Sequence, residues 1–380
     1  MLTKCLNCGL QDSQLILDFG SIPIASLLNS VDIFPLEYRK CIKCLVTCVT
    51  TSPPSDLLYG ENYNFFSSAS SSYISYAGEI IKTLEANTFL SKCNVLEIGC
   101  NDGTLLRQLS PKAKYIVGID PFLIATGPLV GQIPNGNIIN NYFTSETVEK
   151  HNIQESFDVV IVNNVITHVE DVFDFLKALS SVTKKNGIIY FEMCDYQKVV
   201  ECKRFDYFYH GVTNLILPQQ IQSLLSDFEC IADYGFNGFD PFSYKFVLKK
   251  TNSLQKNYPI KEQSLQTMQP DFLSWCEKID TFFNNISSSK KIVGYAANSK
   301  AGSVLALSPI AAKKIDVILD INLMKTNKNI AGSNIKVKHI DDCKLDDIDC
   351  IVLFASHIFD EVRRDLYKRG YTDKILILDI

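Results

Sequence analysis

The stretch that decides the fold reads Val95-Leu-Glu-Ile-Gly99-Cys-Asn-Asp102-Gly103-Thr-Leu-Leu106. It combines an apolar run typical of a buried strand, a glycine-bearing turn and the opening of a helix. Gly99 and Gly103 let the backbone turn sharply and approach a ligand closely. The dinucleotide fingerprint G-x-G-x-x-G is absent, because Cys100 and Asn101 follow Gly99. The stretch therefore predicts a nucleotide-binding loop of another kind.

The acidic side chains around this loop indicate the charge of its ligand. Glu97 and Asp102 would repel a pyrophosphate and suit a cationic, phosphate-free ligand such as S-adenosylmethionine. Asp120 ends the next apolar run, where an acid can hold a ribose by its two hydroxyls. With two asparagines after a later strand, the candidate cofactor-binding residues are Glu97, Gly99, Asn101, Asp102, Gly103, Asp120, Asn163 and Asn164. The alternative is a plain Rossmann core in which the acid at position 120 is incidental.

Short apolar runs alternate with longer periodic segments through the rest of the chain. In a first series the expected strands are 94–98, 115–119, 158–162 and 187–192, and in a second series 291–294, 316–319, 350–354 and 375–378. A polar stretch over 249–263 is expected to be a linker, and a helix is expected over 270–286. Strands that alternate with helices predict parallel, doubly wound sheets and an α/β fold class.

Two cysteine pairs near the start of the sequence predict a zinc site. Cys5 and Cys8 form one C-x-x-C knuckle, and Cys41 and Cys44 form another. Two such turns complete a tetrahedral Cys₄ shell, which leaves no open position for chemistry and is therefore structural. Unliganded surface cysteines and a redox pair are the alternatives. A redox motif normally opens a helix in a thioredoxin-like unit, which this region does not resemble. Cys48 is a spare thiol nearby.

Composition argues against several classes of partner. The net charge of −5 and the pI near 5.6 provide no basic field for holding nucleic acid. The sequence contains no run approaching the roughly 20 apolar residues needed to span a bilayer. The opening stretch MLTKCLNCGL lacks the apolar segment of a signal peptide, so the 13 cysteines are expected to be intracellular thiols and metal ligands. We expect a cytoplasmic protein with a small-molecule substrate and neither nucleic acid nor membrane as a partner.

Several further motifs resemble those of the sugar C-methyltransferases that act on deoxysugar nucleotides. The matching stretches are Leu17-Asp-Phe-Gly20-Ser-Ile-Pro23-Ile-Ala25, Phe34-Pro35-Leu36-Glu37, Tyr63-Asn-Phe65-Phe-Ser67-Ser68, Gly294-Tyr295-Ala-Ala-Asn-Ser-Lys300-Ala-Gly302 and Leu319-Asp320-Ile-Asn322-Leu-Met-Lys325. The resemblance covers nearly the whole chain. It implies S-adenosylmethionine as cofactor, structural zinc and a nucleotide-linked deoxysugar as substrate.

The same resemblance implies a domain order. We expect a small zinc-binding domain over residues 1–60 and a Rossmann-like class I S-adenosylmethionine-dependent methyltransferase domain over 61–250. A linker and helix over 251–285 would lead into a second, smaller Rossmann-like α/β domain over 286–380. A chain of 380 residues is too long for one ordinary core, which agrees with this division.

The chain departs from that family in the catalytic segment. The family's Y-H-E-H stretch corresponds to Tyr209-His210-Gly211-Val212, so its glutamate and the histidine proposed as base are replaced by residues that cannot move a proton. The family's H-G-G-S segment is replaced by Asn237-Gly238-Phe239-Asp240. Ser356-His357 stands where the family has a tryptophan–asparagine pair. The sequence therefore defines the architecture better than the reaction.

Four residues are catalytic candidates. His168 lies just past the expected strand 158–162, where substrate meets cofactor in this fold and where the family carries a histidine implicated in catalysis. A histidine with its ordinary pKa of about 6.5 can move a proton at neutral pH. His210 is a second candidate, as a base or a substrate contact, and Tyr209 and Tyr63 can donate hydrogen bonds to a sugar or its enolate. The alternatives are a helix-start histidine bonded to backbone at 168 and packed aromatic surroundings for the others. The remaining histidines, expected to be structural or on the surface, are His151, His339 and His357.

The resemblance implies methyl transfer to a carbon next to a ketone. The ketone acidifies the neighbouring proton, and hydrogen-bond donors can stabilise the resulting enolate. An oxygen acceptor needs only a base and is the alternative within the same class. A non-catalytic member that binds the cofactor is a third possibility, against which the intact Gly99, Gly103 and Asp120 argue.

Overall fold

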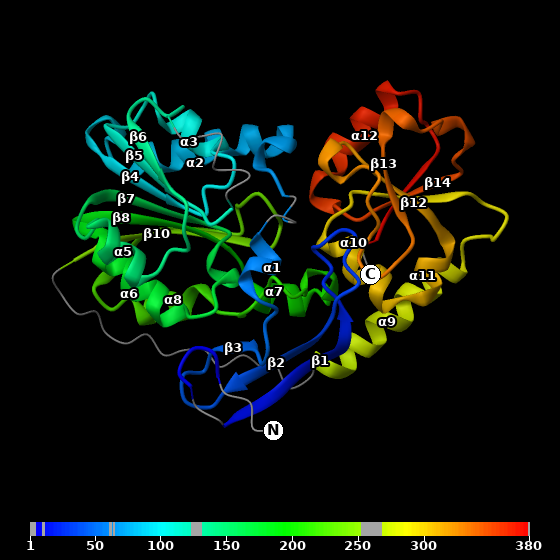
Figure 1. Cartoon of the computed structure of the whole chain (residues 1–380), viewed down its shortest axis with the longest axis horizontal. Coiled ribbons are helices and arrows are strands. Elements are labelled where there is room, and N and C mark those ends of the chain that lie inside the picture. Colours follow the sequence, from blue (N-terminus) through cyan, green and yellow to red (C-terminus); the bar gives the residue numbers. More distant parts are fainter. Residues whose placement is uncertain are drawn as a thin grey trace.

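A computed structural model describes residues 5–9, 12–60, 63, 65–122, 131–251 and 268–378. Residues 252–263 of the expected linker lie outside the described residues. Within the described ranges the strands form three separate sheets. Figure 1 shows them as a curved sheet at the bottom, a large sheet at the left and a smaller sheet at the right. The predicted α/β fold class is confirmed.

The N-terminal sheet is antiparallel, in the order β1-β2-β3. β1 (Ser13–Pro23) pairs with β2 (Ile33–Cys41), which pairs in turn with β3 (Thr47–Val49). Two register shifts interrupt the pairing of β1 with β2. Each shift breaks the alternation of buried and exposed side chains, which is why the period-two signal of these strands is weak in the sequence.

The central sheet has the strand order β6-β5-β4-β7-β8-β10-β9. The parallel strands are β4 (Asn94–Ile98), β5 (Tyr115–Ile119), β6 (Gly136–Ile139), β7 (Phe157–Asn163) and β8 (Thr183–Cys194). β10 (Ser243–Lys250) runs antiparallel to β8 and to β9 (Phe228–Gly235). The strand order reverses between β4 and β7, and ligands of doubly wound sheets bind at the carboxyl ends of the strands beside such a reversal.

Helices cover both faces of the central sheet. One face packs against α2 (Ser71–Asn87) and α3 (Thr104–Leu109), and the other against α5 (Ser145–His151), α6 (Val172–Val182) and α8 (Pro218–Leu224). Successive residues of β7 bury alternately on the two faces, so its sequence reads as one continuous apolar run. Two short helices, α1 (Ser55–Tyr59) and α7 (Tyr196–Glu201), lie in the connections.

The C-terminal sheet is parallel, in the order β13-β12-β11-β14-β15. Its strands are β11 (Ile292–Tyr295), β12 (Ile315–Asp320), β13 (Lys336–His339), β14 (Cys350–Leu353) and β15 (Lys374–Ile377). α12 (Phe359–Lys368) packs on one face, and α9 (Met268–Asn284), α10 (Ser299–Leu307) and α11 (Pro309–Lys314) pack on the other. The expected strands of this series agree with β11, β12, β14 and β15 to within one residue at each end, whereas β13 carries a single buried apolar side chain and was not anticipated.

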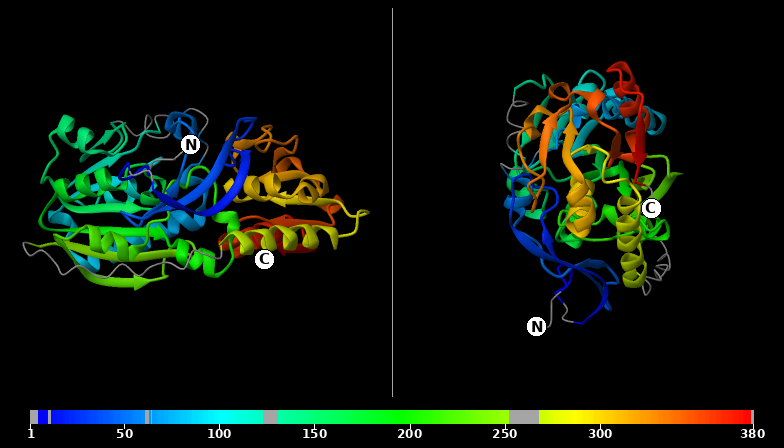
Figure 2. Two further views of the ribbon diagram at one scale, coloured as in Figure 1. Left: turned by 90° about the horizontal axis from the view of Figure 1, so that it is seen from below. Right: turned by 90° about the vertical axis from the view of Figure 1, so that its right-hand side faces the viewer.

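The N-terminal sheet lies across the other two and joins them (Figures 1 and 2). The Tyr38 hydroxyl donates to the Val212 carbonyl at 2.8 Å, and the Asp18 amide donates to the Gln269 side chain at 2.7 Å. A Cβ at Gly302 would approach the Ala25 carbonyl oxygen to 2.4 Å, so only glycine allows α10 this close to the N-terminal segment. None of the described helices is long and apolar enough to cross a membrane.

Candidate functional site

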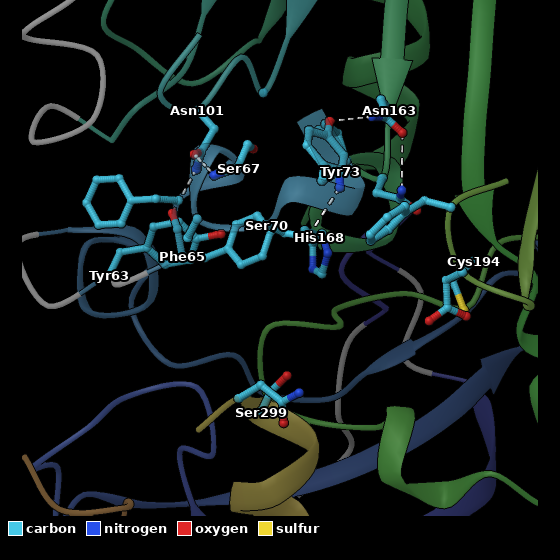
Figure 3. Close-up of a pocket in the computed structure, with 18 of the residues that line it drawn as sticks. Tyr63, Phe65, Ser67, Ser70, Tyr73, Asn101, Asn163, His168, Cys194 and Ser299 are labelled. Carbon is cyan, nitrogen blue, oxygen red and sulfur yellow. Dashed lines mark hydrogen bonds between the residues drawn. The ribbon is translucent and has the colours of Figure 1, made fainter. Parts of the chain in front are cut away.

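A cavity of about 1310 Å³ lies between the central and C-terminal sheets. Residues at the ends of β4, β5 and β7, together with the segment before α2, line it on one side. Residues that follow β11, β12 and β14 line it on the other side. The carboxyl ends of parallel strands from two sheets therefore face one cavity. Figure 3 shows side chains from several of these elements converging on it.

The loop after β4 depends on left-handed backbone. Gly99 has a φ of +71°, and a Cβ there would come within 2.5 Å of Val165 Cγ2. The amides of Gly99 and Cys100 donate to the Ile119 carbonyl at 2.8 and 3.3 Å, which ties the loop to the neighbouring β5. Glycine is therefore required at position 99 for both conformation and space, and it brings the backbone to the wall of the cavity.

Acidic side chains beside this loop fit a cationic nucleoside. Asp120 lines the cavity and accepts hydrogen bonds from the amides of Asn101 and Phe122, each at 2.8 Å. Its carboxylate still has lone pairs for ribose hydroxyls. Glu97 is buried, and among the described residues its Oε2 has no hydrogen-bond partner. Burial, reinforced by Asp120 and Asp102, raises the pKa of Glu97 well above its ordinary value. The raised pKa favours the neutral, protonated form of Glu97, and a cationic ligand beside the loop, such as S-adenosylmethionine, would lower that pKa again.

Asn101 and Asp102 hold the segment before α2 against the loop. The Ser67 amide donates to Asn101 Oδ1 at 3.0 Å, and Asn101 Nδ2 donates to the Phe65 carbonyl at 3.0 Å, as Figure 3 shows. The Ser68 amide donates to Asp102 Oδ2 at 3.0 Å. The structure therefore corrects part of the expected cofactor contacts. The residues that support the loop from behind and do not themselves line the cavity are Glu97, Asp102 and Gly103.

Both asparagines after β7 line the cavity. Asn163 Nδ2 donates to the Tyr73 hydroxyl at 2.8 Å, and Asn164 Nδ2 donates to Asn163 Oδ1 at 3.1 Å. The Asn164 amide donates to the Glu192 carbonyl at 2.7 Å, which fixes its left-handed backbone at a φ of +53°. These bonds place two amide side chains opposite the loop after β4.

His168 ends the short 3-10 helix Ile166–His168 and lines the cavity (Figure 3). Its Nδ1 lies 2.6 Å from the Gly211 carbonyl oxygen. Because a carbonyl can only accept, Nδ1 carries the proton and the neutral ring keeps a lone pair on Nε2. Burial lowers the pKa of His168, and the Gly211 carbonyl offsets this only in part. The ring is therefore neutral at pH 7 and can accept a proton through Nε2.

The two candidate tyrosines also line the cavity. The Tyr209 ring centroid lies 6.2 Å from that of His168, and Tyr59 bridges from His168 to Tyr63 at 6.4 and 5.6 Å. Burial raises the pKa of Tyr209 to about 12 and also raises the pKa of Tyr63. Both phenols therefore stay protonated at neutral pH and can donate hydrogen bonds.

The structure does not bring His210 to the cavity. Its ring is buried, with Nε2 at 3.1 Å from the Phe34 carbonyl oxygen, and Nδ1 has no partner among the described residues. This contact turns the ring toward the N-terminal sheet. A role for His210 as base or substrate contact therefore does not fit the geometry, and its structural alternative does.

A charged cluster in the cavity was missed by sequence reasoning. Asp240 Oδ2 lies 3.4 Å from Lys300 Nζ and 3.6 Å from His357 Nδ1, and the Tyr207 hydroxyl donates to both Asp240 oxygens at 2.7 and 2.9 Å. All four residues line the cavity. His357 had been expected to be structural or on the surface, and its place here corrects that expectation. One signal for this cluster was available in the sequence: Asp240 and His357 both occupy segments in which the chain departs from the family that it resembles.

The four N-terminal cysteines come together at the end of the N-terminal sheet. The sulfur atoms of Cys5, Cys8, Cys41 and Cys44 all lie within 4.8 Å of one another. Four thiolates at this separation suit the tetrahedral shell that Zn²⁺ prefers. The cluster is consistent with a zinc site, and Cys48 is buried beside it.

Comparisons with known proteins match two parts of this chain. The family model described as a methyltransferase domain matches residues 70–232, and the one described as a C-methyltransferase C-terminal domain matches residues 260–377. The chain is 32% identical over 100 residues to the ubiquinone biosynthesis O-methyltransferase of Bradyrhizobium diazoefficiens, a stretch that covers 26% of this chain and 39% of that protein. The curated relatives compared are covered over only 39% to 42% of their length.

Two solved structures are also similar in part. The PH0226 protein from Pyrococcus horikoshii gives a TM-score of 0.39 at 17% identity, over 49% of this chain and 95% of that chain. The N-methyltransferase NodS from Bradyrhizobium japonicum, in complex with S-adenosyl-L-homocysteine, gives 0.37 at 16% identity, over 47% and 88%. The two matched domains follow each other along the sequence, so the chain combines a methyltransferase domain with a C-methyltransferase C-terminal domain.

Proposed function

We propose that this chain transfers a methyl group from S-adenosylmethionine to a carbon next to the ketone of a nucleotide-linked deoxysugar. The observation that carries the proposal is His168, whose Nδ1 is committed to the Gly211 carbonyl and whose Nε2 is left to accept a proton at the cavity. A volume of about 1310 Å³ exceeds the 300–1,000 Å³ of ordinary ligand pockets, which suits two ligands held together. The matched C-methyltransferase C-terminal domain favours carbon as the acceptor.

Bound S-adenosylmethionine would supply an electrophilic methyl group. Of the chain's own residues, Asp120 lines the cavity and would hold the ribose hydroxyls. On the opposite side of the cavity the cationic side chains that suit a diphosphate are Lys325, Arg364 and Lys368.

The proton transfer is the step that the chain itself performs. His168 Nε2 takes the proton from the carbon next to the ketone, the electron pair of that C–H bond forms a C=C bond, and the carbonyl π electrons move to the oxygen. Tyr209 and Tyr63, protonated at neutral pH, can donate hydrogen bonds to the sugar. For methyl transfer, the enzyme must then hold the resulting carbon nucleophile in line with the methyl group.

An oxygen acceptor is the second candidate. The curated relatives are named ubiquinone biosynthesis O-methyltransferases, which favours a hydroxyl acceptor over the stretch that they share with this chain. The same His168 Nε2 would take the proton of a hydroxyl. The two candidates differ in whether the substrate needs a ketone.

Mass spectrometry distinguishes them. The purified protein would be incubated with S-adenosylmethionine and a panel of nucleotide-linked keto- and hydroxy-sugars, with the keto-sugars in deuterated water. We expect a methyl gain that requires the ketone, together with deuterium exchange at the neighbouring carbon. Methyl gain on sugars without a ketone would move the acceptor to oxygen. Cofactor binding without any methyl gain on this panel would contradict the proposal.

A further inference from the structure

Lys300 is a buried cation whose hydrogen-bonding capacity is largely unused. Its side chain is 11% exposed, and its Nζ lies 3.5 Å from the centroid of the Tyr207 ring. The described residues offer the ammonium one acceptor, Asp240 Oδ2, at a long 3.4 Å. An ammonium has three N–H donors. Lys300 therefore presents unused donors at the wall of the cavity, on a side chain that is mostly covered by protein.

Asp240 holds this ammonium in place but only partly neutralises its charge, because the carboxylate is shared with other donors. Its oxygens also accept hydrogen bonds from the Tyr207 hydroxyl and from the Phe242 amide at 3.0 Å. Burial alone would raise the pKa of Asp240, but Lys300 and His357 outweigh it and hold that pKa below its ordinary value. The carboxylate is thus ionised, shared among several donors and held in one place. If a substrate oxygen next to Lys300 became negatively charged, it would meet ammonium N–H donors that Asp240 already holds in place.

Lys300 lies on the side of the cavity opposite the proposed base. It belongs to the first turn of α10, where its neighbour Ser299 interacts with the Tyr209 phenol. Tyr209 in turn lies 6.2 Å from the His168 ring, between centroids. Tyr209 thus lies between the His168 ring and the first turn of α10, to which Lys300 belongs. A ketone placed between them would have its C–H bond facing one and its oxygen facing the other.

We propose that Lys300 binds the carbonyl oxygen of the substrate and stabilises the negative charge that forms on it, with Asp240 and Tyr207 as positioning residues. When His168 Nε2 takes the proton, the C–H electron pair forms a C=C bond and the carbonyl π electrons move to the oxygen beside Lys300. The imidazolium and the enolate balance the proton and the charge, so this step needs no further reactant. The inference rests on the proposed function, because only a ketone substrate forms an enolate.

Deuterium exchange isolates this step from methyl transfer. The full-length protein would be saturated with S-adenosylhomocysteine, which lacks the methyl group, and given nucleoside-diphosphate 4-keto-6-deoxyhexoses in deuterated water. We expect Lys300→Met to slow exchange at the carbon next to the ketone by about 100-fold or more, the loss typical of removing one such donor. S-adenosylhomocysteine affinity should be unchanged. The matched control is Lys184→Met, which removes the lysine of an ion pair with Asp158 (2.9 Å) away from the cavity and should exchange at the wild-type rate.

A second pair of variants separates catalysis from folding. Lys300→Arg keeps a cation and Lys300→Gln removes it, so we expect faster exchange in the arginine variant at equal thermal stability. Asp240→Asn should slow exchange, and adding it to Lys300→Met should cause no further multiplicative loss, because a positioning residue acts through Lys300.

Three results would overturn the inference. Wild-type exchange rates in Lys300→Met, or equal rates in the arginine and glutamine variants, would remove Lys300 from the step while leaving the proposed function intact. Absence of exchange in the wild-type protein with every keto-sugar would overturn the inference and the proposed function together.

Discussion

At the scale of single residues, one backbone carbonyl decides what His168 can do. The Gly211 carbonyl oxygen accepts a hydrogen bond from the protonated Nδ1 of His168. The ring is therefore held in the tautomer that leaves Nε2 free for the substrate. Gly99 acts through the backbone as well, because its left-handed φ and its contact with Val165 exclude a side chain. The role of His168 depends on one hydrogen bond and that of Gly99 on its backbone conformation, so a single substitution at either position tests it directly.

The variant His168→Asn tests the proton transfer. An asparagine amide can still donate to the Gly211 carbonyl but cannot accept a proton, so we expect kcat to fall about 100-fold or more, within the usual range for a lost general base. Because burial lowers the pKa of His168, the wild-type enzyme should keep its base form below the ordinary value of about 6.5. The acidic limb of its kcat/KM profile should therefore lie below that pH and disappear in the variant. Methyl transfer measured by mass spectrometry across pH checks both points, and wild-type kcat in His168→Asn would exclude it as the base.

The variant Gly99→Ala tests the cofactor loop. Alanine at a φ of +71° costs roughly 1–2 kcal/mol, and its Cβ would also meet Val165 Cγ2 at 2.5 Å. Since about 1.4 kcal/mol corresponds to a factor of ten, we expect affinity for S-adenosylhomocysteine to fall tenfold or more. Gly235→Ala is the control, because that glycine has a φ of +60° with nothing within 4 Å of the added Cβ. Calorimetry should show cofactor affinity unchanged in the control, and equal losses in both variants would contradict the role of the loop.

The sequence predicted some site residues better than others for a physical reason. Gly99 and Asp120 belong to a local strand-turn-helix pattern that a short window reveals. His168 and His210 look alike in sequence, and contacts with carbonyls 43 and 176 positions away decide which of them faces the cavity. The cluster around Asp240 joins four distant segments, so no single local pattern could have revealed it.

At the scale of elements, periodicity predicted strands buried on both faces and missed those that lack a continuous apolar run. β4 and β5 agree residue for residue with expectation, because each is a continuous apolar strand beside a turn. β9 is exposed at alternate positions along the edge of its sheet, and β1 is interrupted by register shifts. The expected domain boundaries at residues 60 and 250 stay predictions.

The four-cysteine cluster is the element whose disruption has the clearest expected result. Cys41 ends β2, and its knuckle leads directly into β3, so a metal ion there would fasten two strands to the segment around Cys5. We expect one zinc per chain by mass spectrometry of metals, and none in Cys41→Ser, with a lower Tm. Cys202→Ser, which changes an exposed cysteine outside the cluster, should keep both the metal and the Tm. Full zinc content in Cys41→Ser would contradict the proposed ligand set.

At the scale of the whole molecule, the cavity belongs to neither half of the chain alone. The segments around His168 and Asp120 close it on one side, and those around Lys300 and His357 close it on the other. The N-terminal sheet is bonded to both through Tyr38 and Asp18. The relative placement of the two sides of the cavity therefore depends on all three sheets.

Acid should destabilise the folded protein as a whole. Burial lowers the pKa of three histidines, most strongly that of His357, to about 4, and also those of His168 and His210. Below the unfolded value of about 6.5 the unfolded chain binds more protons than the folded chain, so stability is present above that pH and is lost as pH falls toward 4. We expect the Tm to decline between pH 6.5 and pH 4, and His357→Asn to reduce the slope. A Tm independent of pH over this window would contradict the burial of neutral imidazoles.

The bonds that anchor the N-terminal sheet also have a consequence for how the chain is made. The Asp18 amide bonds to Gln269, and Asn29 Oδ1 accepts from the Asn329 amide at 2.7 Å, partners separated by 251 and 300 residues. Contacts this distant in sequence form late, because the intervening chain must first be brought together. On the ribosome, where domains fold as they emerge, β1 can pair with β2 soon after both leave the tunnel, but Gln269 and Asn329 are translated much later. Apolar side chains of β1 that pack against α9, such as Phe19 against Phe272, must therefore wait, and slower translation through the second half of the chain would lengthen the time during which they are exposed to misassociation.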